Sequence, residues 1–399
     1  MAPNHGQHFL QIPGPSPVPE RILRSMHKQV IDHRGPEFAK LGKQVLEGCR
    51  TIFQTSQPVI IFPSSGTGAW EAAIVNTLSP GDRVLMAETG HFANLWRQMA
   101  ERWGLSVTFL PGDWRRGVDP AAIFATLADD RNHTIKAVMV VHNETSTGSL
   151  SRIPAIRKAI DSAQHPALLM VDTISSLGSA NYRHDEWAVD VSVSCSQKGL
   201  MLPPGLGFTA ISEKALVASR HNKMPRSYWD WSEMLKPNTS GFFPFTPATT
   251  LLYGLREAID MLLEEGLDDV FARHHRLAAA TRAAVEAWGL EVLCQEPSEL
   301  SPVLTAVLMP PGHDADGFRD IALEHYNISL GTGLSRVAGK VFRIGHLGDC
   351  NDLVLMAALS AVEMTLADSA IPHNPGGVLA AMACLRHAPP TIKETLQHA

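Results

Sequence analysis

Short apolar runs alternate with helical patterns along the first half of the chain. The strand-like runs lie at 58–62, 83–87, 106–110, 136–142, 167–172, 190–195 and 206–211, and the helical patterns at 67–78, 92–103, 119–128 and 154–163. Strands that alternate with helices predict crossover units, and therefore a largely parallel sheet covered on both faces. Ligands of such sheets bind beyond the carboxyl ends of the strands, so candidate functional residues are expected there.

The second half of the chain has a different pattern. Residues 221–250 are rich in aromatic rings and proline, which indicates a covered loop. Such a loop is a subunit interface, a wall of an active site or an internally packed segment. A long helical stretch over 248–288 follows, and further strands are expected near 302–308 and 341–344.

These patterns predict the domain organisation. We expect a Pro- and Gly-rich extended arm over 1–19, a large domain over 20–265 and a smaller α+β domain over 266–399. A chain of 399 residues is long enough for two domains with separate cores. The last stretch, 371–399, is expected to be loosely attached.

Composition narrows the class of protein. Apolar residues make up 45% of the chain and charged residues 19%, with a net charge of −6, which is typical of a globular protein and disfavours nucleic-acid or membrane binding. No apolar run approaches the roughly 18 residues of a transmembrane helix, and the N-terminus does not resemble a signal peptide. The five cysteines are scattered and lack metal-type spacing, so we expect a reducing, cytoplasmic location and no metal site.

Two charged residues stand at or just beyond predicted strand ends. Asp172 closes the apolar run that begins at Leu168, and Lys198 follows 26 residues later, just after the next run. This pair suits pyridoxal 5′-phosphate (PLP), because a lysine forms a Schiff base with it and a buried aspartate keeps its pyridine nitrogen protonated. The alternative for Lys198 alone is a solvated surface lysine.

A run of small residues opens the first helical pattern of this sheet. Ser65, Gly66 and Thr67 follow the strand over 58–62, and backbone N–H groups at such a helix start can hold a phosphate with the help of the helix dipole. A plain helix cap explains such a loop equally well. With Asp172 and Lys198, however, the run becomes a candidate phosphate cup.

Four further residues complete the candidate site. Gln197 could bond the phosphate or a ring substituent, and Thr145 could donate to the phenolic oxygen of PLP or cap its own turn. The ring of Phe92 could stack on the pyridine or belong to the core. Arg343, in an otherwise apolar strand, needs a partner: either the α-carboxylate of a substrate or an internal salt bridge.

At this point the chain resembles the class V aminotransferases, in the serine–glyoxylate and alanine–glyoxylate branch. The resemblance rests on Gly66-Thr67-Gly68-Ala69-Trp70-Glu71, His142-Asn143-Glu144-Thr145 and Ala338-Gly339-Lys340-Val341-Phe342-Arg343-Ile344-Gly345-His346-Leu347-Gly348, and it extends from Ile12 to about residue 366. It implies the PLP-dependent transferase fold type I, with a mostly parallel seven-stranded sheet in a large domain, a smaller C-terminal domain and a homodimer, possibly a dimer of dimers.

The resemblance also implies roles for individual residues. The implied cofactor residues are Ser65, Gly66, Thr67, Phe92, Thr145, Asp172, Gln197 and Lys198, with Thr246 donated by the neighbouring subunit, and Arg343 is the implied substrate residue. One departure from the family pattern is Cys195, where glycine is usual. A side chain there would be strained if the position required a positive φ.

The predicted reaction is a ping-pong transamination. L-Serine would donate its amino group and leave as hydroxypyruvate, glyoxylate would leave as glycine, and Lys198 would move the α-proton. L-Alanine and L-aspartate are alternative donors. A cysteine desulfurase or related lyase needs a nucleophilic cysteine on a mobile loop, and the segment 331–339 has none. A PLP-fold module without catalysis is disfavoured by the retained Lys198, Asp172 and Arg343.

Overall fold

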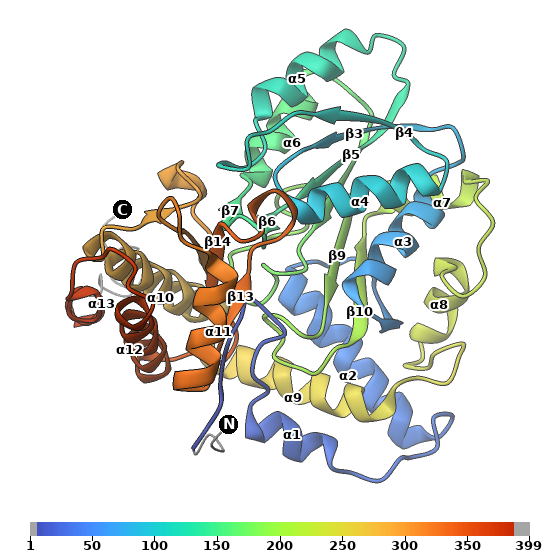
Figure 1. Cartoon of the computed structure of the whole chain (residues 1–399). Coiled ribbons are helices and arrows are strands. Elements are labelled where there is room, and N and C mark those ends of the chain that lie inside the picture. Colours follow the sequence, from blue (N-terminus) through green and yellow to red (C-terminus); the bar gives the residue numbers. More distant parts are fainter. Residues whose placement is uncertain (1–5, 387–399) are drawn as a thin grey trace, which may run out of the picture.

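A seven-stranded sheet organises this computed structural model, which describes residues 6–386 (Figure 1). The strand order is β2(Val59–Ser64), β10(Gly205–Ile211), β9(Val191–Cys195), β8(Leu168–Asp172), β5(Ile135–Val141), β3(Arg83–Ala87), β4(Ser106–Leu110). Strand β10 is antiparallel to both of its neighbours, and the other pairs are parallel. The predicted fold class is therefore confirmed.

Helices cover both faces of this large sheet because its strands are apolar on both sides. In β2, Val59 and Ile61 pack into one core with the helices of one face, while Ile60 and Phe62 pack into a second core on the other. The first face carries α2(Pro36–Phe53), α5(Pro120–Asp129), α6(Ile153–Ser162) and α9(Thr249–Glu265); the second carries α3(Gly66–Thr77), α4(His91–Arg102), α7(Glu213–His221) and α8(Trp231–Asn238). Helix α1(Glu20–Met26) packs on α9.

A second, five-stranded sheet forms beside the large one, and we call it the small sheet. Its order is β1(Phe9–Gln11), β13(Ile328–Thr332), β14(Val341–Gly345), β12(Leu304–Leu308), β11(Glu291–Val292). Its helices are α10(Leu267–Ala287), α11(Ala315–Tyr326), α12(Asp352–Asp368) and α13(Gly377–Arg386), and the single turn η2(Ser335–Val337) joins β13 to β14. A two-stranded hairpin, β6(Asn143–Glu144) and β7(Ser149–Leu150), follows β5.

The strands predicted in both sheets form within about two residues of their expected bounds, but four other expectations are wrong. The arm over 1–19 is not wholly irregular, because β1 pairs with β13. The helix expected over 248–288 breaks at Gly266, whose φ of +88° lies outside the helical region. The segment 221–250 contains α8.

The C-terminal expectation is wrong for the part that the structure describes. Helix α13 packs against α10, and the carboxylate of Glu363 accepts hydrogen bonds from the backbone N–H groups of Gly376 and Val378, each at 2.9 Å. Residues 387–399 of the predicted loose tail lie outside the described residues. No helix within residues 6–386 is long and apolar enough to cross a membrane.

Candidate active site

The amine of Lys198 lies against the N-terminal arm. Its Nζ donates a hydrogen bond of 2.6 Å to the backbone oxygen of Pro13, and the hydroxyl of Ser16 donates to the Lys198 carbonyl at 2.8 Å. A Cβ added to Gly14 would lie 2.5 Å from Nζ, so glycine allows this approach. Burial lowers the pKa of Lys198 to about 8, which increases the share of neutral, nucleophilic amine near neutral pH.

Asp172 ends β8 as a buried carboxylate. One oxygen accepts from the backbone N–H of Ile174 at 2.6 Å and the other from the indole N–H of Trp70 at 3.1 Å. Burial raises the pKa of Asp172 to about 7, and these two donors oppose that rise. None of the ion pairs within residues 6–386 includes Asp172. The carboxylate is therefore prepared for a cation that a ligand brings.

The first turn of α3 is open for an anion. Ser65 is the N-cap residue, but its side chain makes no capping hydrogen bond in the described structure, so the plain-cap alternative is wrong. A Cβ added to Gly66 would lie 2.7 Å from Cγ1 of Ile174, which explains the glycine. Ser65 and Thr67 are exposed. The N–H groups at this helix start are thus available to a phosphate.

The remaining predicted cofactor residues differ in how they are engaged. The hydroxyl of Thr145 donates to the hydroxyl of Ser175 at 2.8 Å, which is a contact within the protein. The side-chain oxygen of Gln197 is buried without a hydrogen-bond partner among the described residues. Phe92, in the first turn of α4, packs against the core shared with α3 yet remains partly exposed.

Arg343 lies on β14, where it is 7% exposed. Its guanidinium donates to the backbone oxygens of Thr332 and Thr145, each at 2.8 Å. Burial lowers the pKa of Arg343 to about 10, which leaves it charged at neutral pH. The alternative of an internal salt bridge is wrong for the part of the chain described here, because no carboxylate lies within 4.0 Å of its side-chain nitrogens.

Three of these residues, Lys198, Asp172 and Arg343, lie near one another. The charges of Asp172 and Arg343 both act on the pKa of Lys198, although Lys198 and Asp172 come from the large sheet and Arg343 from the small one. The arm runs between the two sheets, since a Cβ on Gly331 would lie 2.7 Å from the Pro13 ring. Cys195 is buried at the end of β9 without a positive φ, so the strain considered for it does not arise.

Thr246 is exposed in the loop before α9, and no hydrogen bond within residues 6–386 uses its side chain. Its neighbour Phe245 stacks on Tyr228 with ring centroids 4.9 Å apart, and both rings are 38% exposed. The next ring, Trp229, turns inward: a Cβ on Gly68 would lie 2.8 Å from it. One end of the aromatic segment therefore covers the first turn of α3, and the other faces outward.

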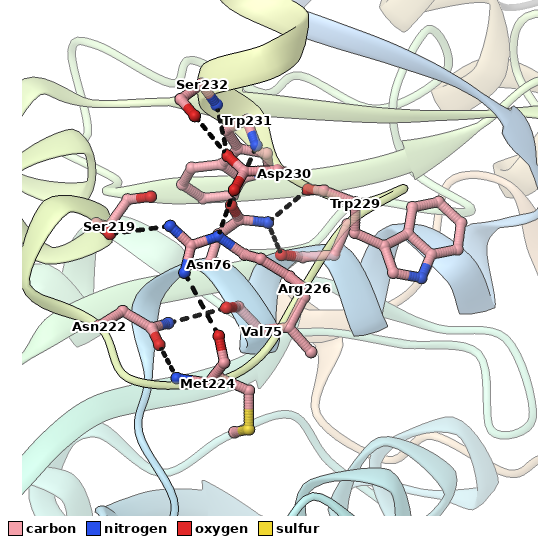
Figure 2. Close-up of polar contacts among 11 residues, drawn as sticks. Val75, Asn76, Ser219, Asn222, Met224, Arg226, Trp229, Asp230, Trp231 and Ser232 are labelled. Atoms are coloured by element: carbon pink, nitrogen blue, oxygen red, sulfur yellow. Dashed lines mark hydrogen bonds and ion pairs between the residues drawn. The ribbon is translucent and has the colours of Figure 1, made fainter. Parts of the chain in front are cut away.

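A polar network anchors this aromatic segment (Figure 2). Asn76 of α3 donates to the backbone oxygen of Trp229 at 2.7 Å and accepts from the backbone N–H of Trp231 at 3.1 Å. Arg226 lies 3.3 Å from the carboxylate of Asp230, which also caps α8. A single buried amide on α3 thus fixes the ring that covers the opposite end of the same helix.

Three functional contributions were missed in the sequence. Trp70, in the quoted motif Gly66–Glu71, donates to Asp172, and Pro13 of the N-terminal arm accepts from Lys198. Both residue types suggest packing only. Glu144 caps α4 through the N–H groups of Phe92 and Ala93, at 3.3 and 3.1 Å. The sequence could have indicated this role, because an acidic residue within a buried run requires hydrogen-bond donors.

The residues present fit PLP on three observations. A buried carboxylate without an ion pair in the described structure suits the pyridinium, and a lysine with a lowered pKa suits the aldehyde carbon. An uncapped helix start suits the phosphate. Within residues 6–386, no group of three or more His, Cys, Asp or Glu side chains is placed to hold a metal ion.

Comparisons with known proteins agree with this chemistry. The family model "Aminotransferase class-V" matches residues 8–345. A serine–glyoxylate aminotransferase of Methylorubrum extorquens is 49% identical over 391 residues, covering 96% of this chain and 97% of that protein. An L-aspartate–glyoxylate aminotransferase of Paracoccus denitrificans is 45% identical, covering 94% and 95%. The crystal structure of a ureidoglycine–glyoxylate aminotransferase from Bacillus subtilis superposes with a TM-score of 0.89 at 30% identity, covering 97% and 100%.

Proposed function

The chain belongs to the class V aminotransferase family, and from that premise we propose that it transfers the amino group of L-serine to glyoxylate. The products are hydroxypyruvate and glycine. Membership of the family makes PLP the cofactor. The observation that carries the reaction type is the convergence of Lys198, Asp172 and Arg343, and similarity to serine–glyoxylate aminotransferases supports the substrates.

The chain's own residues would hold the cofactor and move the proton. Bound PLP supplies an electron sink for the carbanion at the substrate Cα. Asp172 balances the charge of the pyridinium nitrogen, and Lys198 carries the α-proton as general base and acid, for which a pKa near 8 is suitable. Arg343 orients the substrate by its carboxylate.

The remaining contacts position these groups. Ser65, Gly66 and Thr67 would hold the phosphate at the start of α3, and the side-chain NH2 of Gln197 would donate a hydrogen bond nearby. Phe92 would stack on the ring. Thr145, whose hydroxyl now donates to Ser175, would reach the phenolic oxygen only by giving up that contact.

The proposed assembly is a homodimer located in the cytoplasm. The exposed end of the aromatic segment, with Phe245 and Thr246, supports a subunit interface in which Thr246 reaches the partner's phosphate site. An exposed pair of stacked rings beside an unused threonine hydroxyl is better explained by a covering surface than by open solvent.

Arginine placement favours a small neutral donor over L-aspartate. A dicarboxylate needs a second cation near Arg343. Arg97 pairs with Glu101 at 2.6 Å, and Arg336 pairs with Glu88 at 2.9 Å. Arg319, whose charge acts on the pKa of Arg343, pairs with Asp316 at 2.9 Å. Arg34 is exposed in the turn before α2. L-Aspartate and L-alanine remain the alternative donors, the former because of the Paracoccus relative.

A lyase acting through cysteine is disfavoured by the burial of the cysteines. The segment 331–339 holds no cysteine, and burial raises the pKa of both Cys294 and Cys350 to about 11. Such thiols are almost wholly protonated at neutral pH and are poor nucleophiles.

A donor–acceptor matrix tests the proposal. Glyoxylate, pyruvate and 2-oxoglutarate are each paired with L-serine, L-alanine and L-aspartate on PLP-loaded protein, and Lys198→Ala serves as the blank. We expect L-serine with glyoxylate to give the highest kcat/KM. A higher value for L-aspartate would replace the donor and keep the reaction type, whereas no rate above the blank would overturn both.

A further inference from the structure

The turn η2 of the small sheet reaches across to the large sheet. The hydroxyl of Ser335 lies 2.7 Å from Nδ1 of His91, in the first turn of α4. The next residue, Arg336, lies 2.9 Å from the carboxylate of Glu88 and has its guanidinium carbon 5.3 Å from the centre of the Trp114 ring. Two adjacent side chains thus bridge from one sheet to loops of the other, and Figure 1 shows this turn beside the start of α4.

Polar contacts hold the turn at Arg336, while Val337, the last residue of the turn, packs in a small apolar cluster that contains Trp114. A cleft of about 510 Å³ lies there, and its lining includes Glu88, Gly112 and Arg336. Arg336 also donates to the Gly112 carbonyl at 3.3 Å. Glu88 is fixed in turn by the indole N–H of Trp114, which donates to it at 3.0 Å.

The bridged turn is continuous with the residues that hold Arg343. Strand β13 ends at Thr332, whose carbonyl accepts from the Arg343 guanidinium at 2.8 Å, and Gly331 pairs directly with Arg343 in the sheet. The turn then leads into β14 itself. Burial is the main reason for the lowered pKa of His91, and the charge of Arg343 lowers it further. His91 therefore also lies close to Arg343.

We propose that Ser335 and Arg336, bound to His91 and Glu88, form a clasp that positions Arg343 for the carboxylate of both substrates. These are positioning residues and do not touch the reacting atoms. The clasp rests on the proposed function, since it acts only if Arg343 binds a carboxylate. Opening it loosens the turn between β13 and β14, so Arg343 is held less firmly and carboxylate affinity falls. The small sheet keeps its other contacts with the large domain, such as the Gln295 N–H that donates to the Arg115 carbonyl at 2.9 Å, so the lysine chemistry continues.

The test compares Arg336→Gln, Ser335→Ala and the double variant with wild type, all loaded with PLP. We expect the KM for glyoxylate and for the amino donor to rise together by roughly threefold to tenfold in Arg336→Gln, as suits a partly exposed ion pair with a ring contact. The rise in KM should be larger in the double variant than in either single variant, and kcat should stay within about twofold of the wild-type value. The inhibition constant of propionate, a carboxylate that cannot react, should rise in parallel.

Controls separate the clasp from a loss of folding. Arg157→Gln removes a partly buried arginine that pairs with Asp161 at 2.6 Å within α6 and has no contact with η2, and it should leave both KM values unchanged. Glu88→Gln should reproduce Arg336→Gln and add little to it, because the pair acts as one unit. If Arg336→Gln does not fold, Glu88→Gln and Ser335→Ala carry the test alone.

Arg343→Gln distinguishes failure of the clasp from failure of the proposed function. If Arg343→Gln raises KM and the propionate constant but the clasp variants match Arg157→Gln, the clasp is wrong and the function stands. If Arg343→Gln changes neither value, the carboxylate role of Arg343 is wrong, and the clasp falls with it. A drop in kcat at unchanged KM would also overturn the clasp.

Discussion

Asp172 and Arg343 are both buried charges without an ion pair in the described structure, yet they are prepared differently. Two N–H donors hold Asp172 on the large sheet, and burial still raises its pKa to about 7. Two carbonyl acceptors hold Arg343 on the small sheet, where burial lowers its pKa only to about 10. At neutral pH, the aspartate is therefore only partly charged and the arginine fully charged.

This difference suits the ligands that the two residues are proposed to bind. PLP stays in the enzyme, so the carboxylate beneath it can be left half-protonated until the cofactor is loaded. Substrates exchange in every turnover, so the arginine that receives them must always be ready. The site on the large sheet is thus filled once, by the cofactor, whereas the site on the small sheet is filled anew by a substrate in every turnover.

The largest effect is expected from a substitution of Asp172. Asp172→Asn removes the charge that balances a protonated ring nitrogen while it keeps the shape of the side chain. We expect kcat to fall by about 10³-fold with KM much less affected, since the lost interaction matters mainly when the carbanion forms. Steady-state kinetics on cofactor-saturated protein measure this, and a change confined to KM would contradict the assignment.

The cationic side should respond in KM. Arg343→Gln leaves the substrate carboxylate without its charged partner, and we expect the KM for both substrates to rise by about 30-fold or more. Arg343→Lys keeps the charge without the planar guanidinium, so its KM should lie between those of wild type and Arg343→Gln. A lysine variant no better than glutamine would mean that hydrogen-bond geometry outweighs charge here.

A smaller effect sharpens the role of the donors to Asp172. Trp70→Phe removes one of two hydrogen bonds while it keeps an aromatic ring beside Trp96, with which Trp70 stacks at 5.8 Å. Since this bond helps to hold the pKa of Asp172 down, its loss should raise that pKa and lower kcat by roughly tenfold. Trp103→Phe is the matched control, because Trp103 at the end of α4 makes no hydrogen bond to Asp172.

The smallest effect concerns the stability of the cofactor-free protein. The folded pKa of Asp172, about 7, lies above its unfolded value of about 3.9, so its contribution is fully present below about pH 4 and is lost as pH rises through 7. Arg343 is charged throughout that range. The Tm of wild type relative to Asp172→Asn should therefore fall by roughly several °C between pH 4 and pH 7.5.

Arg343→Gln provides the contrast in the same thermal scans. Its Tm difference from wild type should stay constant over that range, because the arginine does not titrate there. Buried His142 and His274, whose pKa values burial lowers to about 3, change stability in the opposite direction as pH falls. They are present in every variant, so differences from wild type remove their effect. Parallel curves for both variants would contradict the comparison.

The large sheet was predictable because its signals are local. A run such as Leu168–Asp172 shows its burial, its length and its terminal carboxylate in the sequence itself. The convergence of Lys198 with Asp172 follows from the general rule for parallel sheets. The resemblance then supplied the roles that residue types alone left open.

What could not be predicted depends on contacts between distant segments. The break at Gly266 was hidden because one glycine inside a helical pattern is usually tolerated. Strand β1 was missed because three residues carry too weak a pattern until β13 offers an edge. The anchoring by Asn76 depends on backbone atoms of Trp229 and Trp231, which no side-chain letter reveals.

The pairing of β1 with β13 also bears on how the protein is made. The residues Phe9–Gln11 must wait for Ile328–Thr332, synthesised some three hundred residues later, before their strand can form. Such a distant pairing is slow to close, because a long loop must be ordered before any contact rewards it. Lys198 therefore gains its neighbours Pro13 and Gly14 late, and a nascent chain that stops short of β13 cannot assemble the environment of its own lysine.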